Sequence, residues 1–283
     1  MNKSFLVSVC IITYNHEKFI AQNLESVLMQ KTNFPIEIVI AEDCSTDNTR
    51  TIIKEYQDKY PDMIRPIFHN KNVGAISNAR DYAIPQCTGK YIALCEGDDY
   101  WSDPEKLQKQ VDFLENNSAY TFCTHRFRVY NEQTKKWDDD VPNNLRSKLF
   151  EGLDYIDIDL EMQFKVWLTQ PLTTVFRRDA LDMTEIQKYQ YFRDVHLFFL
   201  LLRAGKGRCL NMVSAVYRQH VGGVYSNIGV EKRMYESLNV QRELYYNNSD
   251  YDILRNVYLK SIEKYLTKFR RSKYANELKS EYK

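Results

Sequence analysis

The sequence predicts an α/β fold: a mainly parallel central sheet flanked by helices, with a helical C-terminal extension. Three observations support this prediction. In the first half, short apolar runs rich in β-branched residues alternate with segments of helical periodicity, which is typical of βαβ units. Polar clusters directly follow several of these runs, at the sheet edge where such folds bind ligands. From residue 230 onward the pattern becomes helical and aromatic.

Length and composition limit the possible organisation of the chain. Its 283 residues, 43% of them hydrophobic, suffice for one substantial domain and a smaller appendage. We expect a main domain over residues 1–229 and an extension over 230–283. Lys and Arg number 39 against 38 Asp and Glu, so the charge balance gives no reason to expect nucleic acid as a partner.

Cysteine usage and hydropathy predict where the protein works. The six cysteines are scattered without a C-x-x-C pair, so reduced thiols of a cytosolic protein are expected. The N-terminus lacks a signal-peptide pattern, and no stretch approaches the roughly 20 apolar residues that a membrane span needs. We therefore expect a cytoplasmic protein, either free or peripheral on the cytoplasmic face of the inner membrane.

The first half divides into strand and helix signals in alternation. The expected strands, all apolar runs suited to burial on both faces, are residues 5–13, 36–41, 64–68 and 90–95. The expected helices are residues 17–30, 47–60, 77–84 and 104–116. Asp47 is a suitable cap for the second helix, and Pro104 stands in the first turn of the fourth, where its missing N–H costs nothing.

The second half is less regular. Residues 172–176 and 213–218 predict strands, and residues 195–202 predict a buried helix.

Three carboxylates stand within four residues at Glu96-Gly97-Asp98-Asp99, directly after an apolar strand. Holding them together costs electrostatic repulsion, which a bound divalent cation would offset. Oxygen ligands favour Mg²⁺ or Mn²⁺, and these ions often keep substrate phosphates among their ligands. An acidic turn that caps the next helix is the alternative, and the cluster alone does not decide between them.

Several motifs occur in an order that we recognise. They span residues 7–15, 37–49, 72–80 and 89–99. Through them the chain resembles the family 2 glycosyltransferases over most of residues 5–223, especially bacterial members that build capsule, lipopolysaccharide or other surface glycans. The resemblance implies the glycosyltransferase-A fold, with about residues 1–116 binding the nucleotide sugar and about 117–229 binding the acceptor. It also implies inverting, hexosyltransferase-type transfer from a nucleoside-diphosphate sugar to an acceptor hydroxyl.

The resemblance assigns donor-side roles. Thr13 and Tyr14, with Asn15 in the same motif, would touch the nucleotide, and Tyr14 offers a stacking face. Asp43 matches a carboxylate that accepts the uracil N3–H in relatives, which favours a UDP-sugar. Arg80 matches a position near the ribose or diphosphate; a salt bridge to a neighbouring carboxylate is the alternative.

The metal site is also implied by the resemblance. Glu96 and Asp98 occupy the outer positions of the family's D-x-D motif around Gly97. We expect Glu96 near the ribose or close to the metal, and Asp98 as a direct ligand of Mn²⁺ or Mg²⁺. His220 matches a histidine that relatives place on the metal or the diphosphate. The remaining histidines of interest are expected to be structural: His16, His69 and His125.

Inversion requires one base on the acceptor side, opposite the leaving diphosphate. Asp194 matches the family's carboxylate for this role at the start of a late helix; an ordinary N-cap is the alternative. Asp99 is expected to orient the loop or the acceptor. Trp101 is expected beside the acceptor, with core packing as an equally good interpretation.

The tail predicts a basic helix with an aromatic stripe. The stripe consists of Val257, Tyr258, Ile262, Tyr265, Leu266 and Phe269. Such a helix either docks its stripe on the domain or a second subunit, or lies on an anionic membrane, where lipid-linked acceptors are found. Both alternatives stay open, as does a homo-oligomer; the expected ligands are the donor and a glycan or lipid-linked glycan acceptor.

Two other functions stay open. Glu42, Glu96 and Arg193 depart from the family pattern, which is compatible with a catalytically degenerate nucleotide-sugar-binding or scaffold protein. A nucleotidyltransferase also holds a metal on carboxylates, but it should carry a Gly-rich phosphate loop after the first strand, where this chain has residues 13–16, Thr-Tyr-Asn-His.

Overall fold

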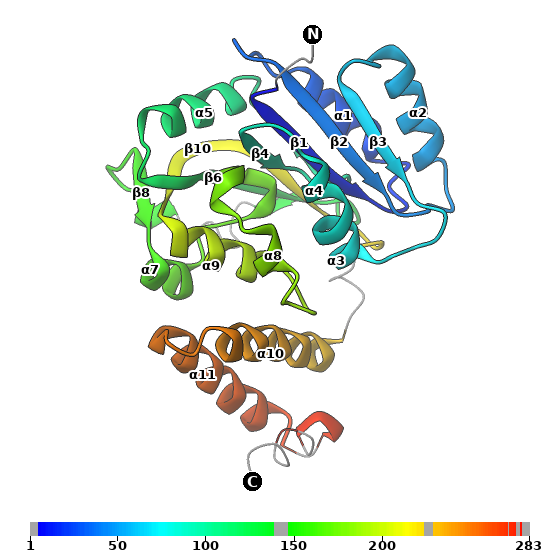
Figure 1. Ribbon diagram of the computed structural model, residues 1–283. Helices are drawn as coiled ribbons and strands as arrows, with labels where there is room; N and C mark the ends of the chain where they lie inside the picture. Colours follow the sequence, from blue (N-terminus) through cyan, green and yellow to red (C-terminus); the bar gives the residue numbers. More distant parts are fainter. Residues whose placement is uncertain (1–4, 139–146, 224–228, 271, 276–277, 279–283) are drawn as a thin grey trace.

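A mixed ten-stranded sheet lies at the centre of the computed structural model, which describes residues 5–138, 147–223, 229–270, 272–275 and 278 (Figure 1). The strand order is β3-β2-β1-β4-β9-β6-β10-β5, with β7 paired to β6 and β8 to β10. The strands are β1 (Val7–Thr13), β2 (Ile36–Glu42), β3 (Ile64–Phe68), β4 (Tyr91–Leu94), β5 (Tyr100–Trp101), β6 (Tyr120–Asn131), β7 (Lys136–Asp138), β8 (Tyr155–Ile158), β9 (Val175–Arg177) and β10 (Lys206–Gln219).

The first four strands of this order confirm the predicted parallel sheet. β1 pairs in parallel with β2 and β4, and β2 pairs in parallel with β3. The carboxyl ends of parallel strands meet at one edge, so the loops that follow Thr13, Glu42 and Leu94 lie together.

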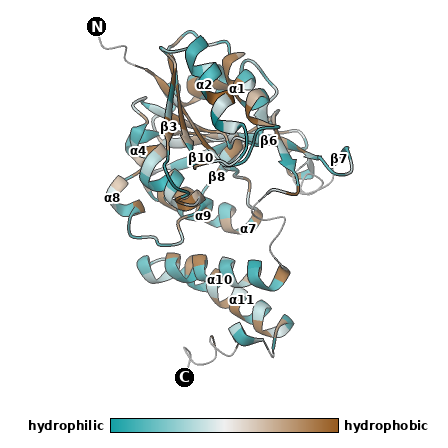
Figure 2. Cartoon of the chain, turned by 90° about the vertical axis from the view of Figure 1, so that its right-hand side faces the viewer, coloured by the Kyte–Doolittle hydropathy of each residue, from teal (hydrophilic) through white to brown (hydrophobic). Residues whose placement is uncertain are grey.

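Helices cover both faces of the sheet. They are α1 (Ile20–Leu28), α2 (Thr49–Lys59), α3 (Ala75–Ser77), a π-helical segment (Asn78–Ala83), α4 (Ile84–Gln86), α5 (Lys106–Asn116), α7 (Leu160–Val166), α8 (Met183–Ile186), α9 (Asp194–Ala204), α10 (Val230–Asn247) and α11 (Asp252–Lys268). Alternate residues of β1 face opposite sides: Val9 packs with α1 and α5, and Cys10 with α4 and α9. The strands therefore carry hydrophobic colours in Figure 2.

The second half differs most from the sequence expectation. The prediction has no strand at β6, which runs for 12 residues, and only part of β10, which runs for 14. Register shifts interrupt the pairing of β10 with β6 between Leu210 and Val213 and between Val213 and Val216. Such irregularities break the alternation of apolar and polar residues by which a long strand is recognised.

The two C-terminal helices pack on each other beneath α7 and α9 (Figure 1). Three residues of the predicted stripe, Tyr258, Ile262 and Tyr265, are buried in a cluster that includes Leu238 of α10. The stripe thus packs on α10, within the extension itself, whereas the prediction had the main domain, a second subunit or a membrane as its partner. In the described parts of the chain, no helix is long and apolar enough to cross a membrane.

One lysine of α5 is fully buried. Lys106, at the start of α5, has no exposed surface. Its Nζ donates to Gln110 Oε1 at 2.8 Å and lies 4.0 Å from the centre of the Trp101 ring. Burial lowers the pKa of Lys106 from the ordinary lysine value to about 7.

This burial predicts a pH-dependent stability. Above about pH 7 the unfolded chain binds more protons at Lys106 than the folded chain does, so wild-type stability should rise with pH, by up to about 1.4 kcal/mol per unit, toward the ordinary lysine pKa. Lys106→Met should lack this rise. Urea unfolding at pH 7.5 and 9.5 gives the free energy of unfolding of both proteins, and Lys109→Met, at a half-exposed lysine, is the control. If wild type and Lys106→Met differ in stability by the same amount at both pH values, the prediction is wrong.

Candidate functional site

Backbone hydrogen bonds join the residues that follow β2 and β4 to the last residues of β1, at the carboxyl edge of the sheet. The Asp43 N–H donates to Thr13 O at 3.0 Å, and the Gly97 N–H donates to Ile12 O, also at 3.0 Å. The chain beyond β10 reaches the same place, because β10 ends at Gln219 and His220 follows. Segments far apart in the sequence therefore meet at one edge.

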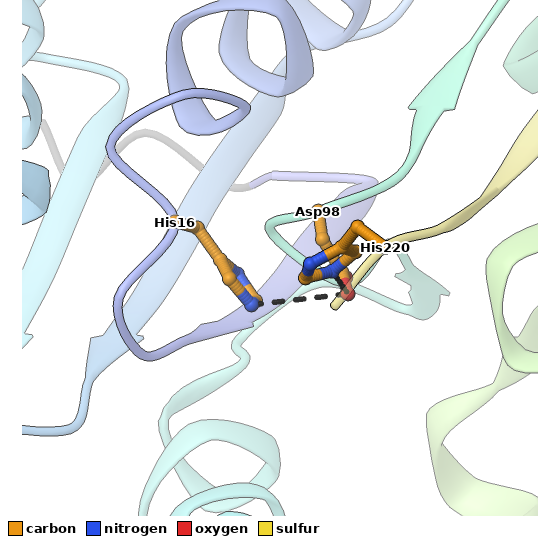
Figure 3. Close-up of side chains that lie close together, drawn as sticks. All are labelled: His16, Asp98 and His220. Carbon is orange, nitrogen blue, oxygen red and sulfur yellow. Dashed lines mark hydrogen bonds and ion pairs between the residues drawn. The ribbon is translucent and has the colours of Figure 1, made fainter. Parts of the chain in front are cut away.

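His16, Asp98 and His220 converge there (Figure 3). His220 Nε2 lies 3.0 Å from Asp98 Oδ2, and His16 Nε2 lies 3.8 Å from the same oxygen. One ligand atom of each residue falls within 4.8 Å of the other two. Two imidazole nitrogens and a carboxylate oxygen form a donor set that fits a divalent transition metal ion such as Mn²⁺.

The protonation states suit metal binding. Burial opposes ionisation of Asp98, but the hydrogen bond from His220 and the nearby imidazoles outweigh it and lower the pKa of Asp98. Burial also lowers the pKa of His16, against the charge of Asp98. An ionised carboxylate and a neutral imidazole are the forms that bind a cation.

Glu96 presents an unsatisfied oxygen beside this cluster. Its Oε2 is buried and has no hydrogen-bond partner among the described residues. Burial raises the pKa of Glu96 to about 7, and the negative charges of Asp98 and Asp194 add to the effect. A cation or a hydroxyl of a ligand would supply the missing partner.

Asp194 is the first residue of α9, and Arg193 is the N-cap residue. The N–H of Val195 donates to Asp194 Oδ1 at 2.9 Å. Burial raises the pKa of Asp194, although this hydrogen bond and the charge of Arg193 oppose the shift. A carboxylate with a raised pKa is a stronger base, which suits proton abstraction.

The loop residues beside β1 and β2 adopt unusual backbone angles. Asn15 has a φ of 57° and Cys44 a φ of 60°, both in the left-handed region. Asn15 Oδ1 accepts the Thr46 N–H at 2.8 Å, which ties the two loops together. Thr13 is buried, whereas the Tyr14 side chain is 41% exposed and presents a ring face at this edge.

Asp43 and Arg80 hold neighbouring backbone groups. Asp43 accepts the N–H groups of Val73 and Gly74 at 2.6 and 3.0 Å. Arg80 pairs with Asp81 at 2.6 Å and donates to Tyr189 O at 2.6 Å.

A cavity of about 600 Å³ opens beside His220. Asn15 and Phe19 line one side, and Glu132 and Arg218 line another. The metal-binding cluster therefore adjoins a space with polar and charged walls.

Comparison with known proteins decides the family. The model of glycosyl transferase family 2 matches residues 8–183. The chain belongs to this family. An Escherichia coli relative, the UDP-Glc:alpha-D-GlcNAc-diphosphoundecaprenol beta-1,3-glucosyltransferase WfaP, is 30% identical over 227 residues, covering 78% of this chain and 80% of that protein. Membership of a family of glycosyltransferases argues against the nucleotidyltransferase alternative.

Other similarities support the fold. An uncharacterized protein of Mycobacterium bovis is 35% identical over 229 residues; the match covers 81% of this chain but only 63% of that protein. The structure of Staphylococcus aureus TarS residues 1–349 with UDP-GlcNAc superposes with a TM-score of 0.67 at 19% identity, covering 93% of this chain and 73% of that one. The Pyrobaculum calidifontis mannosyltransferase PcManGT, in complex with GDP-Man and Mn²⁺, gives 0.58 at 14% identity, covering 99% and 80%. The glycosyltransferase-A fold is confirmed.

For two residues expected on the acceptor side, Trp101 and Asp99, the structure agrees with the alternative role that the sequence left open. Trp101 is 1% exposed and its Nε1 donates to Leu172 O at 2.9 Å, so its ring packs in the core and presents no face to an acceptor. Asp99 is also buried, and its Oδ1 accepts the Arg218 N–H at 2.8 Å. Asp99 therefore orients the end of β10. Of its two predicted roles, orienting the loop or the acceptor, this agrees with the first.

The structure also bears on the expectations for His16 and Arg80. His16 was expected to be structural, and the structure places it with Asp98 and His220 in a group that could hold a metal ion. Its position directly after the Thr13-Tyr14-Asn15 motif was the available signal, because that motif marks the site edge. Arg80 forms the salt bridge to a neighbouring carboxylate that the sequence left open.

Gly97 is required by close packing between β1 and the acidic turn. A Cβ at Gly97 would lie 2.6 Å from Thr13 Oγ1 and 3.0 Å from His16 Nδ1. We expect Gly97→Ala to lower the free energy of unfolding by about 2 kcal/mol through this overlap. Gly229→Ala is the control, because nothing lies within 4 Å of its Cβ, and it should cost about 0.5 kcal/mol or less. Urea unfolding measures both values, and an equal loss of unfolding free energy in Gly97→Ala and Gly229→Ala would contradict the packing argument.

Proposed function

We propose that this glycosyltransferase transfers a sugar, with inversion, from a UDP-sugar to an acceptor hydroxyl. The observation that carries the proposal is the convergence of His16, Asp98 and His220 beside Glu96, whose carboxylate also feels the charge of Asp194. A cation site and a strengthened base at one sheet edge are the two elements that such a transfer requires.

The metal would be held by Asp98, His220 and His16. Asp98 supplies a carboxylate oxygen and the two histidines supply imidazole nitrogens, so the donor set fits Mn²⁺ or Mg²⁺, with the nitrogens favouring Mn²⁺. When bound, the ion neutralises charge on the leaving diphosphate.

Asp194 is the proposed base. Its carboxylate removes the proton of the acceptor hydroxyl as the acceptor oxygen forms a bond to the anomeric carbon. The bond from that carbon to the diphosphate oxygen breaks on the opposite face, which inverts the configuration. Burial of Asp194 favours this proton transfer, because it raises the pKa of the carboxyl toward neutrality.

The donor assignment rests on the sheet edge and on relatives. Tyr14 is partly exposed and could stack on a base, and the Asp43 N–H donates to Thr13 O, so both carboxyl-edge residues lie in the same place. The names of WfaP and of the TarS complex specify UDP-sugars, whereas that of PcManGT specifies GDP-Man. We therefore propose UDP as the nucleotide and make GDP the comparison in the test.

The acceptor is proposed from the relative with a named substrate. WfaP is named for a diphosphoundecaprenol-linked sugar acceptor. A lipid-linked acceptor of bacterial surface-glycan synthesis would place this enzyme at the cytoplasmic face of a membrane. Exposed basic residues of α11, such as Lys260 and Lys264, are available for contact with anionic headgroups.

A thermal-shift experiment tests the donor and metal site. UDP with Mn²⁺ should raise the melting temperature of the wild type more than UDP alone or GDP with Mn²⁺, because ligands that bind only the folded state stabilise it. The shift should vanish in Asp98→Ala and shrink in His16→Ala and His220→Ala. The exposed Asp112→Asn is the control. If UDP with Mn²⁺ raised the melting temperature of Asp98→Ala as much as that of the wild type, the proposed metal site would be wrong.

Turnover tests the base. Asp194→Asn keeps the size of the side chain but cannot accept the proton, so hydrolysis of a UDP-sugar should fall by about 10²- to 10⁴-fold. The UDP–Mn²⁺ thermal shift should remain, because Asp194 is not among the proposed metal ligands. Wild-type rates in Asp194→Asn would rule out this residue as the base.

A further inference from the structure

The segment that leads into Asp194 is held by a helix of the C-terminal extension. Glu243, on α10, accepts the Gln190 N–H at 2.5 Å and the Tyr191 N–H at 2.9 Å. One carboxylate therefore satisfies two consecutive backbone donors, three and four residues before Asp194. Such a pair of charge-assisted hydrogen bonds fixes both the position and the tilt of a turn.

Further contacts join α10 to the same segment. Asn248, the residue after α10, donates to the Tyr189 hydroxyl at 2.9 Å in a buried position. Glu236 lies 3.3 Å from the Arg193 guanidinium. His196, one turn into α9, has its Nε2 3.7 Å from Glu243 Oε2 and is fully buried.

The segment is also held by a residue of the first half of the chain. Arg80, in the π-helical segment, donates to Tyr189 O at 2.6 Å. Arg80 and Glu243 thus both hold the residues that precede Asp194. Asp194 itself is oriented by its backbone, since the hydrogen bond described for its carboxylate comes from the adjacent Val195 N–H.

From these contacts we infer that Glu243 is a positioning residue for Asp194, and that α10 is part of the apparatus of sugar transfer. The inference rests on the proposed function of Asp194. Glu243 fixes the turn at residues 190–191, the turn sets the start of α9, and the start of α9 sets the direction of the Asp194 carboxylate. Small displacements of a base from the reacting hydroxyl are costly, because proton transfer requires hydrogen-bond distance.

The test compares the same substitution at two glutamates of α10, Glu243 and Glu231. Glu243→Gln replaces an acceptor oxygen with an NH₂ group, which faces a backbone N–H and cannot accept it. Glu231→Gln is the matched control, because Glu231 contacts the Tyr265 hydroxyl on α11 and lies away from the segment. Both are assayed as full-length protein with Mn²⁺ for hydrolysis of UDP-glucose, UDP-galactose and UDP-N-acetylglucosamine, and the fastest substrate is kept.

The expected result separates positioning from folding. Glu243→Gln should lower kcat by about tenfold or more, while KM and the UDP–Mn²⁺ thermal shift stay within about twofold of wild type. Glu231→Gln should leave kcat unchanged. If Glu243→Gln is poorly folded, Glu243→Asp replaces it: it keeps both acceptors one methylene further back and should show the same loss in kcat alone, but smaller.

Each outcome has a defined meaning. If Asp194→Asn lowers hydrolysis but the Glu243 variants lower kcat no more than Glu231→Gln, the inference is wrong and the proposed function stands. Losses in KM and in nucleotide binding that match the loss in kcat would also overturn it, because they indicate general damage. If Asp194→Asn has no effect, the proposed base fails and the inference falls with it.

Discussion

Electrostatic repulsion among Glu96, Asp98 and Asp99 is the constraint that shapes the site, because three carboxylates share one turn at the end of β4. The structure relieves it differently at each residue. Asp98 is paired with two imidazoles, Asp99 is buried against the Arg218 N–H, and Glu96 retains a buried oxygen without a partner among the described residues. Burial raises the pKa values of Glu96 and Asp99, and the negative charges of the neighbouring carboxylates add to both shifts.

The groups that relieve the repulsion arrive from distant parts of the chain. His16 follows β1, and His220 follows β10, more than two hundred residues later in the sequence. The sheet order brings both to the acidic turn, since β4 lies beside β1 and β10 is reached through β9 and β6. Stability of the second half of the sheet is therefore a condition for completing the site built on the first.

The sequence was sufficient for the features that depend on local pattern. Apolar runs located β1 to β4, and the acidic turn was visible because its carboxylates are consecutive. Tertiary features were not accessible in this way. The burial of Trp101 and the bond from the Arg218 N–H to Asp99 depend on partners more than seventy residues away. His16 gave no periodic signal, and the irregular register of β10 concealed most of that strand.

The single partly exposed thiol has a practical consequence. All six cysteines lie in the described residues and are free, but only Cys44 is not buried. Burial raises the pKa of several others, including Cys95 and Cys123, and keeps them in the unreactive thiol form. Cys44 adjoins Asp43 on the nucleotide edge and stands in a left-handed conformation. The protein thus carries a natural attachment point for a fluorescent or spin label, at which nucleotide binding to the proposed donor site can be tested without introducing a new residue.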